Sequence, residues 1–259
     1  MWFKEKESDV GAPVGLDWEW ARRTGGVLSG GQRRQLTAKL VAGVPRLVAG
    51  QVALAVGRRG SGRVDFAALQ LPDSTLAKAA EEQARECLSV HVLAHSYRSY
   101  FFGRALAEFD GTRYDDELAY VSCLLHDLQL EHPTPGRCFA VTGAERAVEF
   151  VIGAGATPEQ AETVGAAIAA HLTVGVADTV DDLGFVSAGA AVDVFGARMS
   201  DLDPSWVEEL LRRHPRHNFK QHMTEAFTNE AAAVPNGRAQ WLLRTAGFRQ
   251  LISRAPFAE

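Results

Sequence analysis

His126 and Asp127 stand side by side in a stretch that is otherwise apolar. A buried carboxylate is costly unless it is paired, and a metal ion that accepts both an imidazole nitrogen and a carboxylate oxygen meets that need. His95 lies upstream and Asp193 lies downstream, each flanked by helix-forming apolar residues. His95, His126, Asp127 and Asp193 are therefore candidate metal ligands.

Two neutral imidazoles and two carboxylates would balance the charge of a divalent cation and leave room for a water molecule. The ion would acidify that water toward a nucleophile near neutral pH. Phosphorus, an amide-like carbon and a nitrile carbon are all targets for such a nucleophile, and the ligands do not choose among them. Because the set has no thiolate, zinc, iron, manganese, nickel and magnesium are all open. The imidazoles favour one divalent transition metal over magnesium, zinc or iron first.

The order His, His-Asp, Asp on consecutive helices resembles the HD-domain superfamily of metal-dependent hydrolases, in which residues in this order hold the catalytic metal. The resemblance implies that His95, His126, Asp127 and Asp193 are the ligands. Three segments narrow this resemblance to the branch that includes the cyanamide hydratases, over residues 74–232. The segments are HSYR with YFFG (95–98 and 100–103), FAVTGA (139–144) and PRHNFK (215–220). One position departs from the family pattern, because Gln129 stands where the family usually has Gly. The resemblance implies an HD-domain helical bundle that acts as a hydrolase or hydratase on a small nitrile-type or C–N substrate.

Two further residues are predicted to act in catalysis. Arg98 lies three residues after His95 and shares its helix face, where a guanidinium can orient a ligand carboxylate or hold an anionic substrate. A surface ion pair is the alternative, and the resemblance favours a role at the site. His171 lies on an Ala-rich segment, where related proteins use a His for a second metal or as an acid or base; core packing is the alternative.

Three further polar residues have weaker signals for a role at the site. His91 shares a face with His95 and is expected to bond a carbonyl rather than the site, whereas His132 could line the pocket mouth. Lys220 is expected to brace a helix terminus.

Two other functions stay open besides a small-molecule hydrolase or hydratase. A nucleotide or phosphomonoester phosphohydrolase would need several converging Arg or Lys side chains, whereas a neutral nitrile needs an apolar cup. The aromatic run Tyr97, Tyr100, Phe101 and Phe102 favours the second kind of pocket. The third reading is a metal-stabilised binding protein without turnover, whose metal would have no open coordination position.

Composition sets the broad class. A chain of 259 residues, 46% hydrophobic, can bury a sizeable core in one large domain. Its net charge of -5 argues against a nucleic-acid partner. The three cysteines show no CxxC spacing, so reduced thiols are expected. No uninterrupted apolar stretch reaches the length of a membrane span and no leader is evident, so we expect a cytoplasmic protein without a membrane partner; a homo-oligomer stays open.

Hydrophobic periodicity predicts an all-α fold. Relative to the HD-domain bundle that the resemblance implies, the chain has additional N-terminal and C-terminal helices. Residues 1–73 are expected to form an irregular arm (1–26) and helices that pack on a metal-binding domain over residues 74–259, and the two parts are expected to form one compact unit. Helical patterns cover 32–56 with an interruption at Pro45, 75–109, 114–128, 143–152, 157–171, 185–195, 203–214, 219–232 and 238–254.

Two glycine-rich motifs are set aside. LSGGQ (28–32) matches the signature peptide of ABC transporter ATPases, but the chain has no GxxxxGK[ST], so a Ser-capped helix start is the better interpretation. GRRGSGR (57–63) is expected to be a surface loop.

Overall fold

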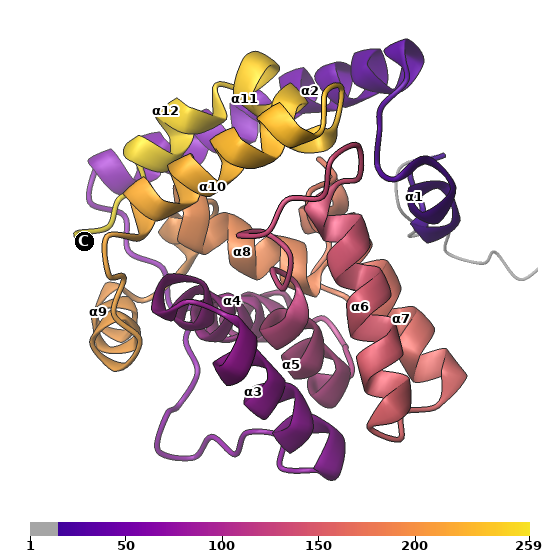
Figure 1. The fold of residues 1–259 in the computed structure, drawn as a ribbon. Coiled ribbons are helices and arrows are strands. Elements are labelled where there is room, and N and C mark those ends of the chain that lie inside the picture. The colour runs from indigo at the N-terminus through magenta and orange to yellow at the C-terminus, as the bar shows by residue number, and fades with distance from the viewer. Residues whose placement is uncertain (1–14) are drawn as a thin grey trace, which may run out of the picture.

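The computed structural model describes residues 15–259, and the part of the predicted N-terminal arm that precedes Gly15 lies outside them. Over the described residues the chain forms α-helices, two short 3₁₀ turns and no strand, which confirms the all-α prediction (Figure 1). The helices are α1 (Trp18–Thr24), α2 (Gly30–Ala55), α3 (Thr75–Cys87), α4 (Val90–Asp110), α5 (Asp116–Leu125), α6 (Phe139–Gly153), α7 (Pro158–Ala170), α8 (Phe185–Phe195), α9 (Pro204–Arg213), α10 (Phe219–Ala233), α11 (Arg238–Thr245) and α12 (Phe248–Ser253).

The pair α4 and α8 lies at the centre of the fold, and small residues let the two helices touch. A Cβ on Gly103 would lie 2.6 Å from the ring of Phe185, and a Cβ on Gly189 would overlap the carbonyl oxygen of Ser99. Both positions therefore require glycine for this close approach. The contact matters for function because α4 carries His95 and α8 carries Asp193.

The other helices surround this pair. Helices α6 and α7 form a hairpin on one side, and α10 to α12 cover another (Figure 1). The predicted start of α7 is confirmed, since Thr157 and Gln160 form a capping box with Pro158 at the first helical position. A single hydrophobic cluster includes residues from Leu16 to Phe257, so the predicted N-terminal and metal-binding segments share one core.

Several predicted boundaries are wrong. The helix predicted over 143–152 begins earlier, at Phe139, and the helix predicted over 114–128 ends at Leu125. The expected helix over 75–109 is divided, because Leu88 is extended and the Ser89 side chain accepts a hydrogen bond from the Val92 N–H and begins α4. The expected helix over 238–254 divides at Gly247, whose φ is +60°. The segment expected to be an irregular arm contains α1, which Asp17 caps.

Helix α2 runs unbroken through Pro45, contrary to the predicted interruption. Pro45 and Val41, whose carbonyl loses its partner, are both exposed, so water can replace the missing hydrogen bond. The predicted cap is confirmed, because Ser29 and Gln32 form a capping box at the start of α2. By length and composition, α2 is the one described helix that could cross a membrane, and none of its most apolar window is buried.

Candidate metal centre

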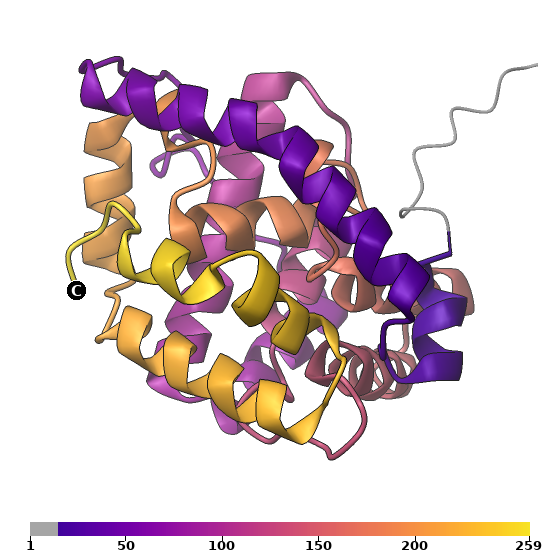
Figure 2. The same cartoon turned by 90° about the horizontal axis from the view of Figure 1, so that it is seen from above.

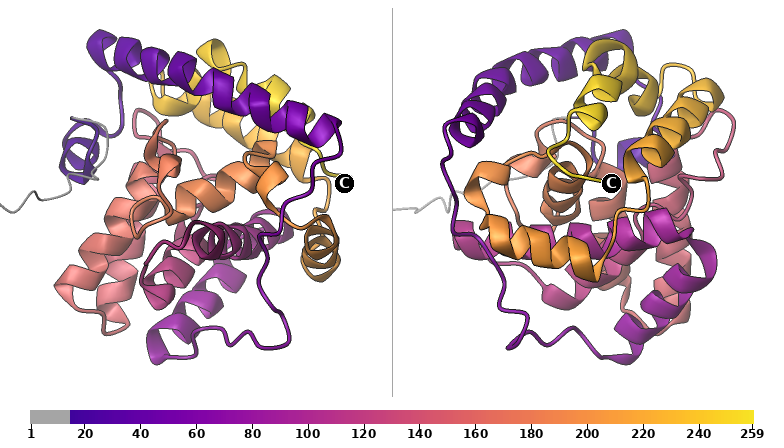
Figure 3. Two further views of the ribbon diagram at one scale, coloured as in Figure 1. Left: turned by 180° about the vertical axis from the view of Figure 1, so that it is seen from behind. Right: turned by 90° about the vertical axis from the view of Figure 1, so that its left-hand side faces the viewer.

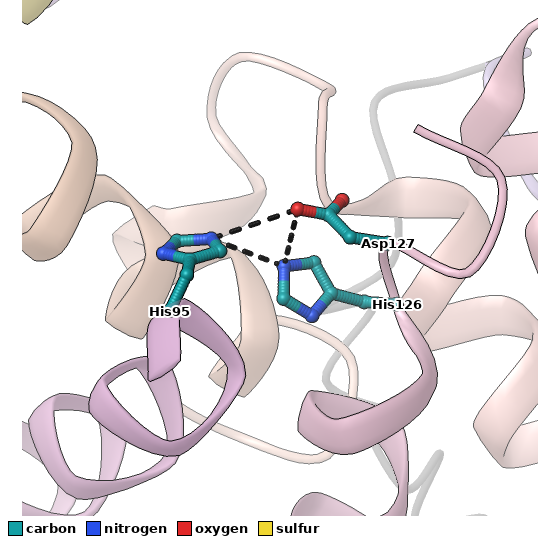
Figure 4. A group of neighbouring side chains, drawn as sticks. All are labelled: His95, His126 and Asp127. Carbon is teal, nitrogen blue, oxygen red and sulfur yellow. Dashed lines mark hydrogen bonds and ion pairs between the residues drawn. The ribbon is translucent and has the colours of Figure 1, made fainter. Parts of the chain in front are cut away.

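Three predicted ligands meet in the core. His95 projects from α4, whereas His126 and Asp127 directly follow the last residue of α5 rather than lying on the helix as predicted. The Nε2 atoms of His95 and His126 are 3.3 Å apart. Asp127 Oδ2 lies 3.3 Å from His126 Nε2 and 3.7 Å from His95 Nε2. Figure 4 shows the three side chains pointing toward one another.

The hydrogen bonds around the imidazoles leave lone pairs facing inward. His126 Nδ1 lies 2.7 Å from the Cys123 carbonyl oxygen, and His95 Nδ1 lies 2.7 Å from Asp193 Oδ2. Both oxygens only accept hydrogen bonds, so each ring places its proton on Nδ1 and a lone pair on Nε2 when it is neutral. Two lone pairs and a carboxylate oxygen then face one another without a donor between them. This donor set fits a divalent cation.

The pKa values of Asp127 and His126 reflect the close approach of these side chains. Burial opposes the charged form of Asp127, but the three surrounding imidazoles, His126 foremost, hold the pKa of this carboxyl well below its usual range. Burial also opposes a charge on His126, yet the Asp127 carboxylate raises the pKa of this imidazole. A metal bound to Nε2 of His126 would exclude a proton from this nitrogen, so metal and proton compete for one site.

Asp193 does not join these three donors, so the structure corrects its predicted role as a ligand. Its carboxylate contacts Nδ1 of His95, the ring nitrogen opposite the one that faces His126. Asp193 is fully buried and holds the His95 ring in the tautomer that offers its Nε2 lone pair. The residue that the sequence places last in the ligand order therefore orients His95, a candidate ligand.

Arg98 is close to the site but does not line the cavity, which corrects its predicted contact with substrate. Its side chain is fully buried and donates to both carboxylate oxygens of Asp193, from Nε at 2.8 Å and from Nη2 at 2.9 Å. The third nitrogen, Nη1, donates to the carbonyl oxygen of Pro215 at 2.9 Å. The sequence allowed two roles for Arg98, orienting a carboxylate or holding an anionic substrate. The contacts with Asp193 correspond to the first role.

Sequence reasoning missed two residues of this cluster. Arg216 Nη1 donates to Asp193 Oδ1 at 2.7 Å, and the Phe219 ring stacks on the His95 ring with centroids 4.7 Å apart. Both belong to the segment PRHNFK (215–220), which was noted only as part of the family resemblance. The available signal was an arginine, Arg216, three residues before a phenylalanine, Phe219, in that segment.

His171 lies beside the three donors, and its predicted role in catalysis stays a prediction. It follows the last residue of α7, its Nδ1 lies 2.6 Å from the Ile168 carbonyl oxygen, and its Nε2 lies 3.7 Å from Asp127 Oδ1. Burial, followed by the neighbouring His126, lowers the pKa of this imidazole to about 3. His171 is therefore neutral and offers a fourth lone pair to the group.

The other polar candidates lie away from the centre. The His91 ring stacks on His222 with centroids 4.2 Å apart, and His132 is exposed. Lys220 Nζ donates to the Phe257 carbonyl oxygen at 2.7 Å, so it braces the chain near the C-terminal end.

A cavity of about 220 Å³ opens onto the four polar side chains His95, His126, Asp127 and His171. Its other walls come from α2, α8, the segment after α7 and the helices α10 to α12. Apart from Thr173 and Ser187 they are apolar or small, and no Arg or Lys among the described residues lines it. The site thus combines a buried set of metal-type donors with an uncharged, apolar chamber.

Neither a protein-family model nor a curated protein matches the sequence. The resemblance to HD-domain hydrolases therefore stays a prediction from the motifs.

Proposed function

We propose that this protein is a metal-dependent hydrolase or hydratase of the HD type that acts on a small uncharged substrate. One observation carries the proposal: three buried imidazole nitrogens and a carboxylate face one another at the end of an apolar cavity. His95, His126 and Asp127 would hold the ion, and His171 would complete the set. A divalent transition metal in this site would acidify water and polarise a substrate atom.

The residues of the chain have separable tasks in this proposal. The Cys123 and Ile168 carbonyl oxygens hold the proton of His126 and of His171 on Nδ1, and Asp193 does the same for His95. Arg98 and Arg216 neutralise Asp193 and fix its direction. The apolar walls exclude bulk water, which strengthens the electrostatic interactions at the site.

The cavity favours an uncharged substrate over a phosphate ester. A phosphate group needs converging cationic donors, and none of the described residues that line the cavity is Arg or Lys. Arg98 and Arg216 are buried and already bonded to Asp193, so neither is free to bind an anion. The chamber is also larger than cyanamide requires, which favours a nitrile-type or C–N group attached to an apolar body.

Elemental analysis of the purified protein, joined to activity assays on one metal-loaded sample, tests the proposal. We expect about one transition metal per chain, and turnover of apolar nitriles or amide-like C–N compounds in preference to nucleotides. Asp127→Asn should remove both metal and turnover, whereas His132→Ala, at an exposed histidine, should change neither. Phosphate release from nucleotides without turnover of any C–N compound would favour the phosphohydrolase. Bound metal without turnover of any compound in the panel would favour a binding protein.

A further inference from the structure

Helix α2 carries a stripe of exposed valines. Among residues 15–259, five of the nine exposed large hydrophobic side chains belong to α2 and the residue that follows it. They are 45% to 74% exposed and are spaced by three or four residues, which puts them on one side of the helix. This valine stripe consists of Val41, Val44, Val48, Val52 and Val56.

The opposite side of α2 is attached to the protein. Leu36 is buried, Leu40 and Leu47 line the cavity, and Trp241 of α11 donates its indole N–H to Thr37 at 3.4 Å. Figure 2 shows α2 lying across the top of the molecule beside α11 and α12, and Figure 3 shows it on the outside in two further views. A helix held along one side in this way can lie on a membrane surface but cannot span the bilayer while it stays attached.

The segment of the sequence that carries the valine stripe has charges of one sign. Residues 20–64 contain nine Arg or Lys residues and no Asp or Glu, although the whole chain has 27 basic and 32 acidic residues. The remainder of the chain therefore has 18 basic and 32 acidic residues. Arg34 lies two turns before Val41, and Arg58 and Arg59 follow Val56 closely, so exposed arginines flank both ends of the stripe. Within the described residues, none of these three is in an ion pair, whereas Arg46 forms an exposed pair with Asp178.

We propose that α2 docks this protein on an anionic lipid surface. The valines would enter the boundary between headgroups and acyl chains, and the flanking arginines would reach anionic headgroups. The acidic remainder of the protein would be repelled by the same surface, which orients α2 toward it. A second copy is a poorer occupant, since pairing two α2 helices would bring the four basic residues of each helix together, Arg33, Arg34, Lys39 and Arg46, with no acidic residue on either helix.

Docking would also bring the cavity within one helix of the lipid, because Leu40 and Leu47, on the attached side of α2, form one of its walls. An apolar substrate dissolved in the bilayer would then have a short path to the site. This last step rests on the proposed function, whereas the docking of α2 does not.

Co-sedimentation of the full chain with phosphatidylcholine vesicles, with and without phosphatidylglycerol, tests the docking. We expect binding that needs the anionic lipid and weakens as salt rises. The double variant Val44→Asn/Val48→Asn should bind at least about tenfold more weakly, because two apolar contacts with the acyl region are lost. Arg58→Gln/Arg59→Gln should weaken binding and reduce its salt dependence.

Matched variants elsewhere on the surface serve as controls. Ile152→Asn changes a residue as exposed as Val48, and Arg113→Gln/Arg212→Gln removes two exposed arginines from other elements. Both should bind like the unchanged protein, and the melting temperature of every variant checks that it folds. Absence of binding to anionic vesicles, or equal binding by the α2 variants and the controls, would overturn the proposal. So would a dimer in light scattering that Val44→Asn/Val48→Asn dissociates. Metal content should be the same in all these variants, so failure of docking is distinguishable from failure of the proposed function.

Discussion

At the residue scale, His95, His126 and His171 have the same hydrogen-bonding pattern. In each, an oxygen acceptor holds the Nδ1 proton, which leaves a lone pair on Nε2. For His95 the acceptor is Asp193, which is why we expect Asp193 to tune metal affinity without supplying a bond to the ion. Asp193→Asn should weaken metal binding by about 10-fold to 100-fold, the usual effect of losing such a partner, whereas Asp127→Asn should abolish it. Competition with a chromophoric chelator measures both. Equal loss of metal in the two folded variants would show that Asp193 is itself a ligand.

A second prediction at this scale concerns Glu230, a buried carboxyl on α10 that accepts a hydrogen bond from the Phe139 N–H at 3.0 Å. Burial raises the pKa of Glu230 from 4.5 to about 7, although this bond and Arg238 oppose the shift. The folded state then binds a proton more tightly than the unfolded state. The resulting stability is present below pH 4.5 and is lost as pH rises toward 7; it amounts to roughly 3 kcal/mol.

Glu230→Gln removes this titration. Its free energy of unfolding relative to the unchanged protein should therefore rise between pH 4.5 and pH 8, as measured by urea unfolding at each pH. Glu208→Gln, at an exposed position on α9, should show no such trend. A flat difference for Glu230→Gln as well would mean that Glu230 is ionised across this range.

At the scale of elements, the contact between α4 and α8 sets the distance between His95 and Asp193. Gly189→Ala would force its methyl group against the Ser99 carbonyl oxygen, so the helices must separate at a cost of about 1 to 3 kcal/mol. Metal affinity should fall with stability, because the bond between His95 and Asp193 crosses this interface. Gly43→Ala is the matched control. Gly43 lies inside α2 and, apart from the nearby backbone of α2 and the two chain neighbours, no atom of the described residues lies within 4 Å of the new methyl group. This variant should therefore stabilise the protein by up to about 1 kcal/mol. Thermal unfolding and chelator competition check both variants. Unchanged metal affinity in Gly189→Ala would mean that the two helices adjust without moving the site.

At the scale of the whole molecule, the metal would join segments that are distant in sequence: α4, the turn after α5 and the end of α7. An ion that binds only the folded chain stabilises it by mass action, by about 4 kcal/mol when its concentration is 1,000 times Kd. For a protein of this size we expect the melting temperature to fall by roughly 10 °C when the metal is removed. Calorimetry before and after chelation measures the change. Asp127→Asn should not respond to the chelator; an equal fall in that variant would trace the effect to the chelator itself.

The sequence by itself determined the helical class, the capped starts at Ser29 and Thr157, and the identity of three metal-type donors. These features depend on local chemistry: periodicity, the residue types at helix ends, and the cost of an unpaired carboxylate in an apolar segment. The division of the predicted helix over 75–109 was within reach as well, since Ser89 is a good capping residue.

Only the tertiary structure decided that Asp193 faces the outer nitrogen of His95, and that Arg98 and Arg216 meet on that carboxylate. Spacing along a helix fixes which residues share a face, but it does not fix which atom of a ring a residue 98 positions away will approach. The same holds for the cavity, whose walls come from helices across the whole chain. The exposure of the valine stripe on α2 also depends on which side of that helix the core covers.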